Sequence, residues 1–356
     1  MRLKAGSALL LAAGLIILVQ GCSFRRNRLD TPILSDSAQP DKELFDRAMA
    51  DLERSRYTIS RLTLQTLMNT YPDSEYMAKA KLGVADSWYR QGGTSNLLQA
   101  EAEYKDFITF FPTMPESAEA QMRVAMIHYQ EMEKADRDSN HARRAEQEFQ
   151  RLLLSYPNGQ FSAQAIQRLR EVQEILARGA FEVARFYFLQ KSDKATQPRL
   201  KELIERYPNF SESDSALYMM GQSLERSDEK NAAEAAAYYS RIVRDYPLSD
   251  RVRDAKERLA DLKLPIPDPD PVAVARMTYE MSHREEEGVR DKFMGIFRSR
   301  PSVAAAQGKL GEPTMTLQGP AQPDSSATSL APAPRLEPGQ NTLSLESVPD
   351  PDRTPR

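Results

Sequence analysis

The sequence contains one cysteine, Cys22, among 356 residues. A single thiol excludes an intramolecular disulfide, a zinc site built from thiolates and a catalytic pair of cysteines. Histidine is almost as scarce, because only His128, His141 and His283 occur, far apart in the chain. The motifs HExxH, GxSxG and the P-loop are also missing. These absences argue against an enzyme, and we predict a protein that carries no catalytic residue, cofactor or metal.

Long apolar runs are missing except for one, Ala8–Val19, which follows two basic residues and ends at Gly21-Cys22. This run is about half of the roughly 20 residues that a helix needs to cross a bilayer, so a permanent transmembrane segment is the weaker interpretation. The order of basic, apolar and cleavage regions is typical of a signal peptide. The small residue before Cys22 resembles the lipobox of bacterial lipoproteins, which predicts removal of residues 1–21 and acylation of Cys22. The alternative is an ordinary secretory signal with a chance cysteine.

Aromatic residues are absent from 299–356, a region that is also rich in proline. Such a segment buries too little apolar surface to offset its ordering entropy, so we expect a disordered tail. We interpret 22–41 as a lipidated tether and 264–298 as a proline-rich spacer followed by an amphipathic helix, in which Val289, Phe293, Ile296 and Phe297 share a face. The formal charge of −3 becomes −5 once the two basic residues of the signal peptide are removed. This mild acidity argues against general nucleic-acid binding.

The region 42–263 contains a repeated pattern in which an aromatic residue followed by proline closes an amphipathic stretch. The five pairs are 39 to 51 residues apart, within the range of helical solenoids: Tyr71-Pro72, Phe111-Pro112, Tyr156-Pro157, Tyr207-Pro208 and Tyr246-Pro247. Each follows a trio of apolar residues with helical spacing: Leu64, Leu67 and Met68; Tyr104, Phe107 and Ile108; Phe149, Leu152 and Leu153; Leu200, Leu203 and Ile204; Tyr239, Ile242 and Val243. Proline ends a helix, so each pair predicts a helix end.

A serine follows each pair within a few residues, and its hydroxyl could cap the next helix: Ser74, Ser117, Ser162, Ser213 and Ser249. Together the repeats predict an all-α chain of antiparallel helix pairs that are stable only when stacked. The arrangement resembles tetratricopeptide repeats, and we count five. The fourth has a long first helix, from Gln160 to about Gln190. A different array of helical hairpins remains the alternative.

Solenoids of this kind bind partners through extended surfaces. Four side chains on the predicted first helices are candidates for a groove that receives an apolar peptide: Tyr89, Met122, Met126 and Tyr129. For each of them, burial between helices is the competing interpretation.

Two other patterns invite a ligand hypothesis. Asp136-Arg137-Asp138 could suggest a metal, but the rest of a calcium loop is missing, and capping is favoured. Gly92-Gly93 is too short to cradle a phosphate and indicates a helix end.

A narrower resemblance rests on the stretch from Asp136 to Phe188. It contains the run DRDxxHAR (136–143), then Tyr156-Pro157-Asn158 and Phe161, then a long helix that ends with 183–188, VARFYF. These motifs, with the lipobox and the repeats, resemble the BamD family, lipoproteins of the machine that inserts β-barrel proteins into the bacterial outer membrane. Residues 41–120 match this family only as repeats.

The resemblance implies five repeats and an outer-membrane location facing the periplasm. It also implies binding to a periplasmic POTRA domain of BamA, to unfolded β-barrel precursors and to other lipoproteins of the complex. The family has an arginine eight residues before the tyrosine of the fourth Tyr-Pro pair, at the contact with BamA, and Arg199 occupies that place. Ser23 after Cys22 agrees with outer-membrane sorting. The alternatives are another repeat lipoprotein, such as a pilus or secretin pilotin or a cell-division coordinator, and a peptidoglycan hydrolase, for which no residue set was found.

Overall fold

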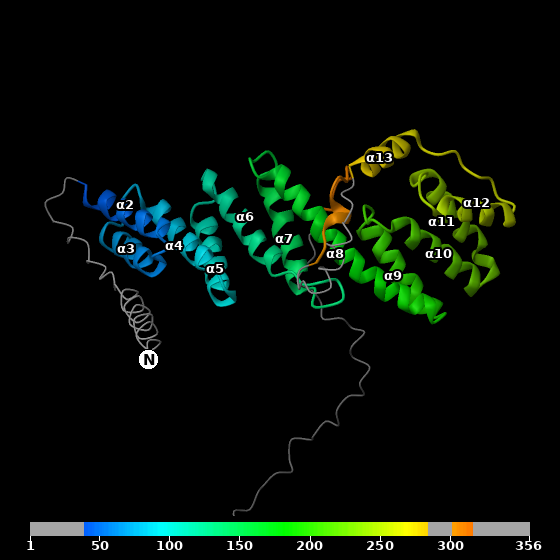
Figure 1. Cartoon of the computed structure of the whole chain (residues 1–356), viewed down its shortest axis with the longest axis horizontal. Coiled ribbons are helices and arrows are strands. Elements are labelled where there is room, and N and C mark those ends of the chain that lie inside the picture. The colour runs from blue at the N-terminus through cyan, green and yellow to red at the C-terminus, as the bar shows by residue number, and fades with distance from the viewer. Residues whose placement is uncertain (1–38, 284–300, 316–356) are drawn as a thin grey trace, which may run out of the picture. The chain divides into compact units, whose positions relative to one another are not determined.

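The computed structural model describes residues 39–283 and 301–315, and within these ranges it contains helices and no strand. The predicted all-α fold is therefore confirmed. Five helix pairs follow one another along the chain: α2 (Pro40–Glu53) with α3 (Tyr57–Thr70), α4 (Met77–Gln91) with α5 (Thr94–Phe110), α6 (Pro115–Gln130) with α7 (Asn140–Ser155), α8 (Ser162–Leu189) with α9 (Asp193–Arg206), and α10 (Ser213–Ser227) with α11 (Ala232–Asp245). Each helix packs on the next, as in a tetratricopeptide-like solenoid (Figure 1).

The aromatic-proline pairs lie at the end of every second helix, as predicted. Helices α3, α5, α7, α9 and α11 each stop one residue before the aromatic of a pair. The backbone N–H of that aromatic still donates to the last turn, but the following proline has no N–H with which to continue it. The long first helix of the fourth repeat is α8, within two residues of the predicted bounds. Gly92 and Gly93 adopt positive φ angles of 68° and 83° between α4 and α5, which confirms that they end a helix.

The serines after the pairs do not all cap the next helix. Ser249 reaches the next helix, because its hydroxyl accepts from the backbone N–H of Arg251 (3.0 Å), the first residue of α12. The Ser74 hydroxyl accepts from the N–H of Tyr76 (3.1 Å), the residue directly before α4. The other three serine hydroxyls donate to carbonyl oxygens of the preceding helix cap or turn instead: Ser117 to Phe111, Ser162 to Tyr156, and Ser213 to Pro208 and Phe210. The prediction was wrong for these three, because each hydroxyl points back to the turn before its helix and not to an N–H group of the helix start.

The core follows the apolar trios, of which only Met68 and Ile108 are partly exposed. Three second helices each bury one aromatic side chain completely: Tyr104 in α5, Phe149 in α7 and Tyr239 in α11. Tyrosine hydroxyls also link repeats, since Tyr156 donates to the carbonyl of Pro112 (3.2 Å) and Tyr246 to that of Pro208 (3.0 Å). Each repeat therefore depends on its neighbour for both apolar and polar contacts.

The solenoid ends with α12 (Arg251–Asp261), which buries Ala255 and Leu259. A spacer without helix follows, then α13 (Pro271–Ser282), whose cap residue Asp270 accepts from the N–H of Val272. The four apolar residues predicted to share a face at 289–297 lie outside the described residues. None of the helices in the described ranges is both long and apolar enough to traverse a bilayer.

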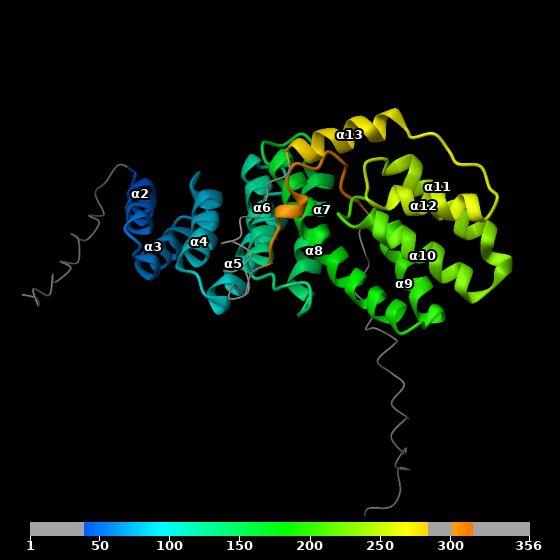
Figure 2. The same ribbon diagram turned by 45° about the vertical axis from the view of Figure 1, so that its right-hand side comes forward.

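The prediction of disorder from residue 299 onward does not hold for residues 301–315. This segment contains a short 3-10 helix, Ala304–Ala306, and lies along α8, with Ala306 only 1% exposed (Figures 1 and 2). It needs no aromatic side chain of its own because the helices it lies on supply the apolar surface and most of the hydrogen-bonding side chains. Residues 316–356 lie outside the described residues.

Candidate functional site

The first candidate surface is formed by consecutive first helices, α4, α6 and α8. Tyr89 of α4 and Tyr129 of α6 are half-buried. The hydroxyl of Tyr89 accepts from Gln130 (2.8 Å), and its ring packs edge-on against Tyr104, 6.2 Å between centroids. Tyr129 donates to the carboxylate of Glu171 on α8 at 2.6 Å. The two tyrosines thus connect neighbouring repeats through polar tips while part of each ring faces solvent.

Burial and the hydrogen bond to Glu171 raise the pKa of Tyr129 to about 12. Arg168 completes this group, since it donates to the Tyr129 hydroxyl at 3.1 Å and to Glu171 at 2.8 Å. Glu171 is 2% exposed, and hydrogen bonds from these two partners satisfy its buried carboxylate. The phenol is therefore a fixed hydrogen-bond donor at neutral pH.

The two methionines of the predicted groove differ in their surroundings. Met126 is partly exposed and packs on the edge of the core, whereas Met122 is 5% exposed and lies within it. A side chain so buried cannot contact a ligand without rearrangement, so Met122 is withdrawn from the candidate set. Helical spacing identified the face of α6 but not how deeply its neighbours cover each position. Tyr89, Met126 and Tyr129 remain candidates.

Arg199 lies on α9 and faces the last turns of α8. Its guanidinium is 4.4 Å from the ring centroid of Tyr187, and one nitrogen donates to the carbonyl of Ala195 at 2.9 Å. The ring of Tyr187 meets that of Phe186 edge-on, at 5.4 Å. Three large apolar side chains of this part of α8 are exposed, by 49% to 67% of their surface: Val183, Phe186 and Leu189. Arg199 is thus held by stacking beside an uncovered apolar patch.

The DRDxxHAR run contributes to a charged cluster between the second and third repeats. The Nδ1 of His141 is 3.3 Å from the Nδ1 of the buried His128, whose Nε2 is 3.2 Å from a carboxylate oxygen of Glu101. Lys105 joins Glu101 (2.6 Å) to Glu148 (3.1 Å). Hydrogen bonds from His128 and Lys105 lower the pKa of Glu101 to about 2.

Asp138, in the same run, accepts from the N–H of Asn140 at 2.9 Å, as a turn-forming residue does. No group of three or more potential metal ligands occurs in the described ranges. The run therefore supports the joint between two repeats.

The comparisons with known proteins agree with this architecture. A family model described as an outer membrane lipoprotein, YfiO, matches residues 37–238. The chain belongs to the YfiO/BamD family. Relatives named outer membrane protein assembly factor BamD include one from Haemophilus influenzae, 24% identical over 237 residues, which covers 64% of this chain and 85% of the relative. One from Rickettsia prowazekii is 22% identical over 249 residues, or 70% of this chain and 94% of the relative.

Family membership confirms the resemblance and places the chain among outer-membrane lipoproteins, as predicted. These relatives are named as assembly factors, which agrees with the prediction of a protein that is not an enzyme. Cys22, the predicted lipidation site, lies outside the described residues. A further surface on α7 and α8, covered by residues 301–315, was not found from the sequence, because it involves a segment that composition had assigned to disorder.

Proposed function

We propose that this lipoprotein is a subunit of the β-barrel assembly complex, binds a periplasmic domain of BamA and assists the recognition, folding and insertion of outer-membrane β-barrel precursors. The observation that carries the proposal is the family match over 37–238, together with curated relatives named as outer membrane assembly factors. Acyl chains on Cys22 would hold the solenoid at the membrane, since each buried methylene contributes about 0.8 kcal/mol. Confinement to the membrane would raise its effective concentration near BamA.

The two ends of the solenoid take different roles in this proposal. Precursor segments bind at Tyr89, Met126 and Tyr129, whose half-exposed side chains offer apolar and aromatic area on α4 and α6. BamA binds at Arg199 and at the exposed apolar side chains of α8. Stacking on Tyr187 pre-orients the guanidinium, which then meets a carboxylate of the partner, and Phe186 fills an apolar contact beside it.

A pull-down with BamA as bait tests the interface. Arg199→Glu reverses the charge at the proposed contact, and we expect at least a tenfold loss of affinity, because breaking a desolvated charge pair costs about 2–5 kcal/mol. Arg253→Glu on α12 is the matched control: it makes the same charge change at a side chain that is 83% exposed, and should bind like wild type. Retained binding by Arg199→Glu would remove this interface assignment without affecting family membership.

A further inference from the structure

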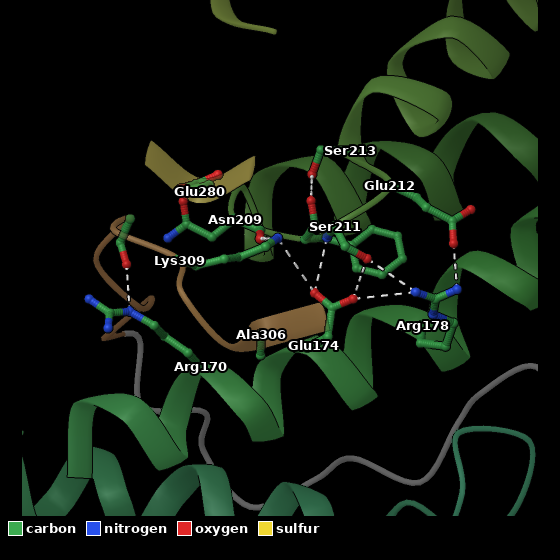
Figure 3. Close-up of polar contacts among 12 residues, drawn as sticks. Arg170, Glu174, Arg178, Asn209, Ser211, Glu212, Ser213, Glu280, Ala306 and Lys309 are labelled. Carbon is green, nitrogen blue, oxygen red and sulfur yellow. Dashed lines mark hydrogen bonds and ion pairs between the residues drawn. The ribbon is translucent and has the colours of Figure 1, made fainter. Parts of the chain in front are cut away.

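The segment 307–315 lies across α8 as an extended peptide whose backbone is held by side chains of the solenoid. Arg170 donates its Nε–H to the carbonyl of Gly311 at 2.8 Å, and the Asn209 amide donates to the carbonyl of Glu312. Figure 3 shows Arg170 and Asn209 on opposite sides of this crossing. Contacts of this kind recognise the backbone of a bound peptide and do not depend on its side chains, as in the addition of a strand to a sheet.

Thr314 is the most completely bonded residue of the segment. Its N–H donates to Gln173 Oε1 (3.0 Å), and its carbonyl accepts from Gln173 Nε2 and from Gln150 Nε2, both at 2.8 Å. The Gln173 carboxamide thus pairs with both polar groups of one peptide residue, as a neighbouring strand would. The Thr314 hydroxyl donates to the carbonyl of Arg206 at 2.8 Å. This last bond requires serine or threonine at the position.

One of the two side chains that hold Thr314, Gln173, is itself fixed by the solenoid. Gln173 also donates to Glu146 (3.1 Å), and Glu146 pairs with Arg206 at 3.1 Å. Gln150 and Gln173 are 1% and 6% exposed. A buried carboxamide anchored in this way is pre-organised for a bound peptide, so little ordering entropy is lost on binding.

Two further positions of the segment have their own requirements. The ammonium of Lys309 lies 3.7 Å from Glu174, a carboxylate that is 4% exposed and is also held by Arg178 and Ser211 (Figure 3). Gly311 runs so close to Asn209 that a Cβ there would collide with its side chain. The surface therefore selects a cation, a small residue two positions later, and a hydroxyl residue three positions after that.

We infer that this surface on α7, α8 and the turn after α9 is a docking site for an extended peptide of a partner polypeptide, with the pattern Lys-x-Gly-x-x-Thr, and that the protein's own segment 307–315 occupies it in cis. A tethered occupant acts at an effective concentration in the millimolar range, so weak intrinsic affinity suffices to fill the site. A partner segment of higher affinity would displace it. The inference does not depend on binding to BamA.

The test uses the full mature chain, residues 22–356 with Cys22→Ser, and a fluorescent synthetic peptide of residues 304–316. The double variant Gly311→Trp, Thr314→Arg releases the cis segment and leaves the site on the solenoid unchanged. We expect the peptide to bind this variant at least tenfold more tightly than it binds wild type. The matched control Leu310→Gln changes a half-exposed side chain of the same segment and should behave as wild type.

The same peptide carrying valine in place of Thr314 should bind the released variant at least tenfold more weakly, which requires no change to the protein. In wild type, an excess of peptide should increase deuterium uptake by the chain's own segment 301–315, which checks displacement without any variant. The inference would be overturned if wild type and the released variant bound the peptide equally. It would also be overturned if the released variant, with the circular dichroism of wild type, bound no peptide, or if the valine substitution had no effect on peptide binding.

Discussion

At the residue scale, the charged cluster between the second and third repeats shows how polar side chains can join helices. Glu101 and Lys105 of α5 meet His128 of α6, so the contact between these two helices includes ion pairs. Hydrogen bonds with His128 and Lys105 stabilise the carboxylate of Glu101 and lower its pKa to about 2. Such a group links stability to pH.

The sign of this linkage follows from the folded pKa of Glu101, which lies below its ordinary value of 4.5. Its stabilising contribution is complete above about pH 4.5 and is lost as the pH falls through 2. We predict that Glu101→Gln lowers the free energy of unfolding by about 1–3 kcal/mol at pH 7, and that its difference from wild type shrinks below pH 4.5. Urea unfolding followed by circular dichroism at pH 7 and pH 3 measures both values.

Glu119→Gln is the control for this variant, because Glu119 and its partner Arg123 are both 41% exposed. An exposed ion pair contributes about 0–1 kcal/mol, so this substitution should have little effect at either pH. A Glu101→Gln deficit that stayed constant from pH 7 to pH 3 would contradict the proposed ionic origin of the stabilisation.

At the scale of the element, each helix is stabilised chiefly by the helices on either side of it. The terminal helix α12 lacks a following helix of the solenoid, and it is attached through Leu259, Ala255 and the ion pair of Arg258 with Glu225. Its loss would uncover the apolar surface of α11. A truncated core side chain at this end of the solenoid should therefore unfold the terminal helices before it unfolds the whole protein.

We predict that Leu259→Ala, at a side chain with no exposed surface, destabilises the protein by about 2–5 kcal/mol. Hydrogen exchange should show loss of protection first in α12 and α11, with α4 to α7 unchanged. Leu248→Ala is the control, since Leu248 is 42% exposed and its truncation should cost less than about 1 kcal/mol. Uniform loss of protection along the whole solenoid would contradict this nearest-neighbour account.

The elements could be predicted from the sequence to the extent that their signals are local. Proline ends a helix within its own turn, so the five aromatic-proline pairs predicted five helix ends to within one residue. Contacts between distant segments gave no such signal, because Thr314 meets Gln150 and Gln173, which lie 164 and 141 residues away along the chain. The helix that carries Met122 could be predicted, but the choice between groove and core for this side chain could not, since periodicity does not reveal what covers a side chain.

At the scale of the whole molecule, one chain carries a proposed lipid anchor, a solenoid and a cis-bound segment. Family membership establishes the class of protein, whereas Cys22 and Arg199 are proposed as the residues through which it meets the membrane and BamA. The anchor and the solenoid are separate parts of the chain in this account, since the buried apolar core of the described residues is formed from Ala48 onward.

We predict that Cys22→Ser abolishes membrane association without changing the stability of the solenoid. Two or three acyl chains bind a bilayer far more firmly than the tether's charges alone. Membrane fractionation, with mass spectrometry of the N-terminal peptide, measures anchoring, and thermal unfolding of both proteins measures stability. A Cys22→Ser protein that still sediments with washed membranes would show that another segment provides the anchor.

The most direct test of the central claim is co-purification of the full-length, acylated protein from detergent-solubilised outer membranes, with the bound proteins identified by mass spectrometry. The account predicts that BamA is recovered with the wild-type protein and with Arg253→Glu, and is depleted at least tenfold with Arg199→Glu. Recovery of the wild-type protein without any component of the β-barrel assembly machine would contradict it.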